Sequence, residues 1–130
     1  MTEDHNFRVP IVFIFEDLGD SGGELIRYLS PKTVNRIEKN LPLEGRTALS
    51  EKGVYFGIPL IMGKEKAKFN VEKGVIAYWP QGNAICIFYD KAKTYSPVNI
   101  IGRIMKNLEL VAKVKSGTKI RFERVINEGN

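Results

Sequence analysis

One serine in the sequence has neighbours that are compatible with a nucleophile. Residues 19–23, GDSGG, place Ser21 between an acid and two glycines, a pattern found around nucleophilic serines. Such a serine needs an imidazole to take its proton and an acid to orient that imidazole. The only histidine is His5, which lies in a polar stretch near the N-terminus. Because aspartate, serine and glycine all favour turns, a hairpin turn explains the same residues, and we do not expect a protease.

Other catalytic and ligand-binding patterns lack support. Cys86 is the only cysteine and lies in an apolar run, which favours a small core residue over a nucleophile. One cysteine and one distant histidine exclude a zinc site of the usual kind, so we expect no metal and no cofactor. No phosphate-binding loop and no dinucleotide-binding glycine motif is present. The adjacent carboxylates Glu16 and Asp17 are expected to be solvated loop charges rather than a glycosidase-type pair.

The composition is typical of one globular domain. The 130 residues are 43% hydrophobic and 27% charged, which is enough to bury a core without disulfides. The formal charge of +5 is a mild basic excess, and its densest run, residues 64–73, is interrupted by Glu65 and Glu72. That interruption favours a solvated face over a nucleic-acid patch. With no apolar run of ~20 residues and no signal peptide, we expect a cytoplasmic protein without a membrane partner.

Apolar runs between turn residues predict about eight short strands. Residues 84–89 show no polar alternation, which predicts a strand that is buried on both faces. This strand is expected to form a hairpin with residues 75–79 around the turn 80–83, PQGN. Residues 16–23 are expected to be a hairpin loop. The remaining expected strands are residues 9–15, 24–29, 53–61, 66–71, 110–114 and 119–125.

Two Ser-Pro pairs predict the starts of two helices. Ser30-Pro31 and Ser96-Pro97 each place a capping hydroxyl before a residue that has no amide hydrogen to satisfy. The first helix is expected to end near residue 40, and the second to carry an apolar face over residues 98–108.

So many strands in so short a chain favour closure of the sheet, because closure removes exposed edges. We therefore expect a mainly β fold: a closed antiparallel β-barrel of about eight strands with two short capping helices. Residues 7–126 are expected to form this single domain, with a flexible tail at residues 1–6 and a C-terminal tail at residues 127–130.

Several segments resemble one known family. Residues 30–37, SPKTVNRI, resemble the Ala-Pro-Lys-Thr-Val helix start of cyclophilins, and the order of strands and helices is similar. The closer resemblance is to the small microbial cyclophilin-like family of uncertain function. It is carried by residues 41–46 (LPLEGR), 54–59 (VYFGIP), 74–80 (GVIAYWP), 84–88 (AICIF) and 96–103 (SPVNIIGR). The matching order spans roughly residues 9–125 and implies a cyclophilin-type barrel.

The resemblance also implies where a ligand would bind and how the chemistry differs. Cyclophilins carry an arginine that polarises the prolyl amide nitrogen, and Gly57 occupies that place here. Without this guanidinium, we expect a binding module for a small molecule or peptide, held in an aromatic cleft. The candidate cleft residues are Arg46, Tyr55, Phe56, Tyr78, Trp79, Gln81 and Phe88.

Two alternatives stay open at this point. The barrel core is the competing interpretation of the aromatic side chains, above all for Phe56 and Phe88. The alternative function is a diverged or weak peptidyl-prolyl isomerase, with Arg46 as the candidate source of the missing charge. The sequence identifies neither the ligand nor the oligomeric state.

Overall fold

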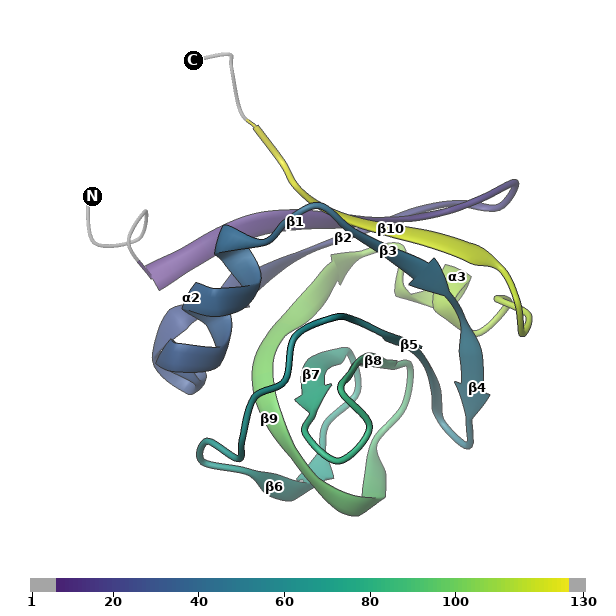
Figure 1. The fold of residues 1–130 in the computed structure, drawn as a ribbon. Helices are drawn as coiled ribbons and strands as arrows, with labels where there is room; N and C mark the ends of the chain where they lie inside the picture. The colour runs from purple at the N-terminus through teal and green to yellow at the C-terminus, as the bar shows by residue number, and fades with distance from the viewer. Residues whose placement is uncertain (1–6, 127–130) are drawn as a thin grey trace.

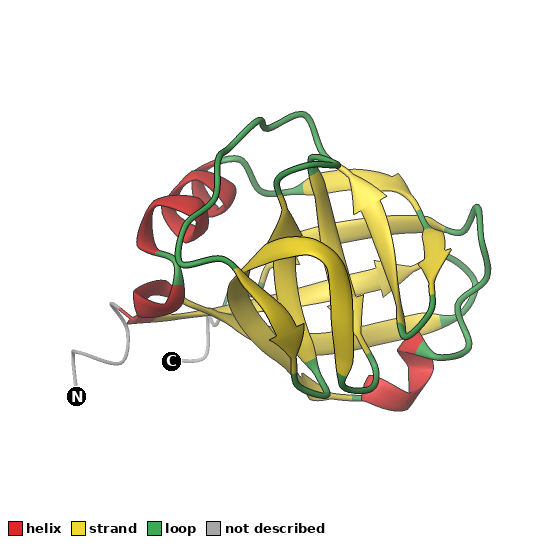
Figure 2. Ribbon diagram, turned by 90° about the horizontal axis from the view of Figure 1, so that it is seen from below, coloured by secondary structure: helices red, strands yellow, loops and turns green. Residues whose placement is uncertain are grey.

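The computed structural model describes residues 7–126, whose strands form a strongly curled antiparallel sheet (Figures 1 and 2). The strands are β1 (Arg8–Phe15), β2 (Gly19–Ile26), β3 (Leu43–Arg46), β4 (Ala48–Ser50), β5 (Gly53–Gly57), β6 (Lys68–Val71), β7 (Val75–Trp79), β8 (Ala84–Phe88), β9 (Ala92–Lys106) and β10 (Lys119–Arg124). The 3-10 helix η1 (Arg27–Leu29) and the α-helix α2 (Pro31–Lys39) lie at one end of the sheet, and α3 (Leu108–Val111) lies at the other (Figure 2). The tails expected at residues 1–6 and 127–130 lie outside the described residues.

The sheet has ten strands and is not closed. Its strand order is β3-β10-β1-β2-β9-β7-β8-β5-β4, with β6 paired to β9 beside this path. A mainly β, antiparallel fold with two α-helices is therefore confirmed, but the closed barrel of about eight strands is wrong. The two end strands, β3 and β4, follow each other in the chain with only Thr47 between them. Strand β3 pairs with β10 and β4 pairs with β5, and no ladder joins β3 to β4 within residues 7–126.

The main core lies inside the curl of the sheet. Phe13 and Phe122 stack with their ring centroids 4.4 Å apart, and Phe56 meets both rings edge-on. Strand β8 is buried on both faces, as predicted. Its residues Ile85 and Ile87 belong to the main core, whereas Cys86 and Phe88 pack in a second, smaller cluster on the outer face, the outer cluster.

The prediction of a helix over residues 98–108 is wrong, because residues 98–106 belong to the long strand β9. Strand β9 pairs with β2, β6 and β7, and its register shifts along each of these ladders. One shift inserts Ile101 between the residues that pair with Ile76 and Ala77. Such a bulge breaks the period of two. Ile101 and Ile104 can then both be buried, which produces the helix-like spacing in the sequence.

Two other elements also differ from the prediction. Strand β2 begins at Gly19, so the hairpin loop is shorter than residues 16–23. The strand predicted at residues 110–114 is wrong, because Leu110 and Val111 belong to the short helix α3 and pack against the main core from one end. Among the described residues, no helix has both the length and the apolar character to cross a membrane.

Candidate functional site

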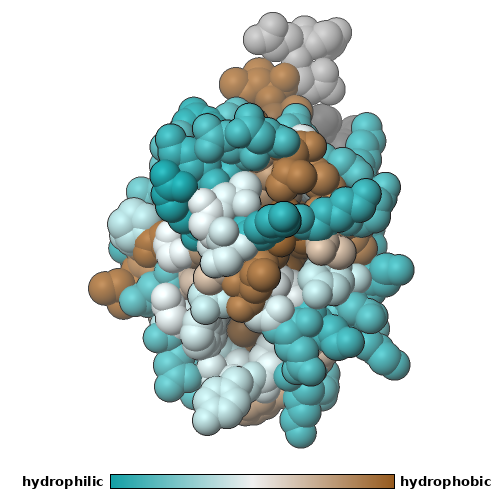
Figure 3. Space-filling view, turned by 90° about the vertical axis from the view of Figure 1, so that its right-hand side faces the viewer, coloured by the Kyte–Doolittle hydropathy of each residue, from teal (hydrophilic) through white to brown (hydrophobic). Residues whose placement is uncertain are grey.

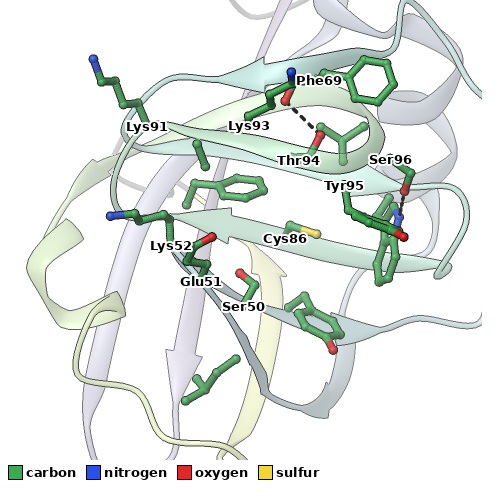
Figure 4. Close-up of a pocket in the computed structure, with 16 residues that line it drawn as sticks. Ser50, Glu51, Lys52, Phe69, Cys86, Lys91, Lys93, Thr94, Tyr95 and Ser96 are labelled. Atoms are coloured by element: carbon green, nitrogen blue, oxygen red, sulfur yellow. Dashed lines mark hydrogen bonds between the residues drawn. The ribbon is translucent and has the colours of Figure 1, made fainter.

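A pocket of about 870 Å³ lies on the outer face of the sheet, on the side away from the main core. Strands β5, β7 and β8 form its floor, and the β4–β5 hairpin, β6 and the start of β9 form its walls (Figure 4). We call it the outer pocket. Its lining residues are Leu49, Ser50, Glu51, Lys52, Tyr55, Phe69, Trp79, Cys86, Phe88, Lys91, Ala92, Lys93, Thr94, Tyr95, Ser96 and Val98.

Trp79 is held in place at one end of the outer pocket. Its indole Nε1 donates a hydrogen bond to Ser96 Oγ at 2.6 Å, which ties β7 to β9. The ring of Tyr55 meets the indole edge-on, with centroids 5.7 Å apart and planes at 86°. Gly82 lies against the indole, since a Cβ there would come within 2.3 Å of Trp79 Cε3. The half-buried indole is therefore a fixed wall, with its polar atom already satisfied.

The floor of the outer pocket is apolar. Phe88, Val98 and Cys86 belong to the outer cluster, and each is less than 9% exposed. Burial raises the pKa of the Cys86 thiol to about 12. The thiol is therefore protonated at neutral pH, and Cys86 serves as a small apolar floor residue rather than as a nucleophile.

Charged side chains stand at the rim of the outer pocket. Lys52 is half-buried, whereas Lys91, Lys93 and Glu51 are exposed. Three lysines against one glutamate leave a formal excess of two positive charges. No described carboxylate forms an ion pair with these lysines. On the face that Figure 3 shows, hydrophobic groups lie in patches between hydrophilic side chains.

The structure brings three of the seven candidate residues into the outer pocket: Tyr55, Trp79 and Phe88. Phe56 and Tyr78 point into the main core. The Tyr78 hydroxyl bonds Leu60 O at 2.9 Å and accepts a hydrogen bond from the amide of Met62 at 3.0 Å.

Arg46 and Gln81 lie away from the outer pocket. Arg46 Nη1 donates to Gly117 O at 2.9 Å and lines a second depression of about 430 Å³, on β1, β3 and β10. Gln81 is exposed in the β7–β8 turn and lines neither cavity.

The sequence reasoning missed the walls of the outer pocket. Strand β6 and the first residues of β9 supply Phe69, Thr94, Tyr95 and Ser96, and the helix predicted from Ser96 hid this part of the strand. A signal was present in residues 91–95, KAKTY, where Lys91 and Lys93 alternate with the smaller Ala92 and Thr94 as in a strand with one face covered.

Ser21 has a structural role. It is fully buried, and its hydroxyl donates to Asn107 O at 2.8 Å, where the chain leaves β9 in a left-handed conformation. Its neighbour Gly23 lies against β9, since a Cβ there would be 2.4 Å from Arg103 O. The glycine-rich segment therefore allows β2 and β9 to approach closely.

Comparison with known proteins identifies the fold. A sequence profile for the family described as cyclophilin-like matches residues 10–123. The chain belongs to the cyclophilin-like family. The solution structure of the hypothetical protein AF2241 from Archaeoglobus fulgidus aligns with 92% of this chain and 96% of its own, with 31% identity and a TM-score of 0.78. McbB in complex with tryptophan aligns with 92% of this chain and 45% of its own, with a TM-score of 0.75. At 12% identity, that likeness shows the fold alone. No curated protein matches this chain.

Open space lies beside Gly57, the residue to which the sequence resemblance assigns the place of the cyclophilin arginine. Gly57 is exposed at the end of β5, two residues from Tyr55, and a Cβ there would meet no described atom within 4 Å. No arginine lines the outer pocket among the described residues. In this cyclophilin-like protein, the cationic groups that line the outer pocket are thus lysines, which stand beside aromatic rings.

Proposed function

We propose that this cyclophilin-like protein binds a small organic molecule in the outer pocket. The observation that carries the proposal is a concave apolar floor with a rigid aromatic wall at one end. A volume of about 870 Å³ falls within the range of roughly 300–1,000 Å³ that is usual for small-molecule sites. The residues that would contact the ligand are Tyr55, Trp79 and Phe88, with Phe69 closing the pocket from β6.

Wall residues on paired strands favour a preformed site. Trp79 is fixed by its hydrogen bond to Ser96, and Thr94 Oγ1 donates to Phe69 O at 3.0 Å, which holds β9 against β6. Few side chains then have to be ordered when a ligand arrives, which lowers the entropic cost of binding.

The proposal can be tested with a neutral apolar dye. N-phenyl-1-naphthylamine gains fluorescence in an apolar site, so we expect saturable binding to the folded protein. Phe69→Ser should weaken this binding by about fivefold, because the ligand loses an aromatic contact. Leu18→Ser is the matched control: Leu18 is 42% and Phe69 is 47% exposed, but Leu18 lies outside the outer pocket. Absence of saturable binding, or equal losses in both variants, would contradict the proposal.

A further inference from the structure

The outer pocket has two chemically different ends. Strand β8 runs along its floor, and the strand register places Trp79 beside Ala84 at one end. At the other end, Phe88 pairs with Gly53, and the amide of Tyr89 donates to Lys52 O at 2.9 Å. Figure 4 shows Lys52 and Lys91 on the side of this second end, with Lys91 above Lys52, and Tyr95 and Ser96 on the opposite side.

The distance between the two ends follows from strand geometry. Ala84 and Phe88 are four steps apart in an extended strand of about 3.3 Å per residue, which gives about 13 Å. The floor between them is formed by the apolar side chains of Cys86 and Phe88. A ligand that touches both ends must therefore be elongated and apolar along its length.

The charged side chains of the pocket, its three lysines and Glu51, form no ion pair with the described residues. The hydroxyl of Thr94 is bonded to Phe69 O, and the hydroxyl oxygen of Ser96 accepts the indole N–H of Trp79. By contrast, the ammonium groups of Lys52 and Lys91 form no ion pair or hydrogen bond with the described residues. The unpaired charge at the rim is thus net positive, with three lysines against the single carboxylate of Glu51, and two of the lysines, Lys52 and Lys91, stand at one end.

We propose that the ligand is an elongated organic anion of the carboxylate class. Its carboxylate would lie between Lys52 and Lys91, and its aromatic or alkyl tail would lie on Cys86 and reach Trp79. This inference rests on the proposed function and deepens it by assigning a ligand class. Charge complementarity supplies the orientation, and the apolar floor supplies the contact area.

The test compares an acid with its alcohol. Phenylhexanoate and phenylhexanol share a tail and differ in charge, and both can be titrated against bound N-phenyl-1-naphthylamine. We expect phenylhexanoate to displace the dye at about fivefold lower concentration, because exposed lysines give modest attraction. The advantage should shrink as salt is added. Phenylacetate, which is too short to span the two ends, should displace the dye more weakly than phenylhexanoate.

Charge-removing variants locate the effect. In Lys52→Gln/Lys91→Gln, the acid should lose most of its advantage over the alcohol, and comparing the two ligands within the same variant corrects for any change in dye affinity. Lys39→Gln/Lys113→Gln removes two exposed lysines outside the pocket and should retain the preference for the acid.

The possible failures are distinguishable. If the alcohol displaces the dye as well as the acid does, or if the control variant loses the preference equally, the assignment to carboxylates is wrong while small-molecule binding stands. If the dye itself does not bind, the proposed function fails, and the ligand class fails with it.

Discussion

Glu65 caps the helix α2 through Thr33. Its Oε1 accepts hydrogen bonds from both the backbone amide and the hydroxyl of Thr33, each at 2.8 Å, and its Oε2 accepts one from the amide of Lys32 at 2.9 Å. Ser30, the cap expected from the sequence, instead donates its hydroxyl to Ile100 O at 2.8 Å. A carboxylate 32 residues away from Thr33 thus satisfies the first amides of α2 and anchors the β5–β6 connection to it.

Replacing Glu65 should cost stability in a pH-dependent way. Burial tends to raise the pKa of Glu65, but the hydrogen bonds from Lys32 and Thr33 outweigh it and hold the pKa below 4.5. A carboxyl group with a lowered pKa in the folded state contributes stability above its unfolded pKa, and that contribution is lost as pH falls through the folded pKa. We therefore expect Glu65→Gln to lower the free energy of unfolding by about 1 kcal/mol at pH 7. The difference from wild type should shrink as the pH falls below 4.5.

Urea unfolding at neutral and acid pH measures this effect. Glu72→Gln is the control, because Glu72 is an exposed carboxylate in the next connection and forms no side-chain hydrogen bond within residues 7–126. A loss for Glu65→Gln that is the same at both pH values would show that the carboxylate charge does not contribute to the cap.

Neighbouring glycines in β2 should respond very differently to alanine. A Cβ at Gly23 would lie 2.4 Å from Arg103 O, a backbone atom that cannot move aside, whereas the nearest atom at Gly22 is Lys106 Cβ at 3.9 Å. We expect Gly23→Ala to destabilise the protein by about 2 kcal/mol or more through overpacking. Gly22→Ala should change stability by less than about 0.5 kcal/mol. Thermal unfolding of the two variants checks this, and equal effects would mean that the close approach of β2 and β9 is wrong.

Sequence patterns predicted the elements that local chemistry decides. The apolar run of β8, the turn residues before it and the proline at the start of α2 were sufficient to place those elements. Strand β9 was missed because three separate pairings and their bulges decide its conformation, and the Ser-Pro signal at residue 96 cannot reveal them. Closure was overestimated for a similar reason. The general tendency of sheets to avoid exposed edges does not reveal that the end strands β3 and β4 lie on either side of Thr47 without pairing with each other.

The candidate site was predicted in part for the same physical reasons. Tyr55, Trp79 and Phe88 lie on β5, β7 and β8, strands that the apolar runs of the sequence predicted. Phe56 and Tyr78 are the chain neighbours of Tyr55 and Trp79, and strand alternation sends them to the opposite face. The lysine end of the outer pocket depends on loops and on the pairing of β6 with β9, which are long-range features without a local sequence signature.

The Cys86 thiol should make stability fall at alkaline pH. Burial raises its folded pKa from 9.0 to about 12. A raised folded pKa means that the stability contribution is complete below pH 9.0 and is lost as the pH rises toward 12, because the unfolded thiol ionises first. Relative to Cys86→Ala, the wild type should therefore lose about 1 kcal/mol between pH 8 and pH 10. The other ionisable groups are the same in both proteins, so a constant difference would contradict the prediction.

Labelling provides a second check on Cys86. At neutral pH, its thiolate fraction in the folded protein should be about a thousandfold below that of the unfolded chain, since the pKa rises from 9.0 to about 12. Iodoacetamide should thus react with Cys86 far faster in urea than under native conditions. Rapid stoichiometric alkylation of the native protein would show that the thiol is reactive.

Prolyl isomerase activity is expected to be absent. Gly57 supplies no guanidinium, and Arg46 is bonded to Gly117 O outside the outer pocket. We expect the rate on a prolyl tetrapeptide to equal the uncatalysed rate, whose time constant of tens to hundreds of seconds makes even weak catalysis visible. Acceleration that is proportional to protein concentration and lost in Arg46→Ala would favour the isomerase alternative.

Trp79 and Tyr78 should separate binding from folding, because they are adjacent in β7 and face opposite sides. Trp79 is half-buried in the outer pocket, whereas Tyr78 is fully buried and its hydroxyl bonds Leu60 O, Met62 N and Asn83 Oδ1. Trp79→Ala should leave the protein folded and cost less than the ~3–5 kcal/mol of a core tryptophan. It should nevertheless weaken binding of N-phenyl-1-naphthylamine at least about tenfold, since the aromatic wall is lost.

Tyr78→Phe should do the opposite. It leaves the partners of the hydroxyl unsatisfied and should cost about 1–3 kcal/mol, with dye binding unchanged. Urea unfolding and dye titration of both variants measure the two effects. If Trp79→Ala unfolds the chain, or if Tyr78→Phe weakens dye binding as much as Trp79→Ala does, then the division between the core face and the ligand face of β7 is wrong.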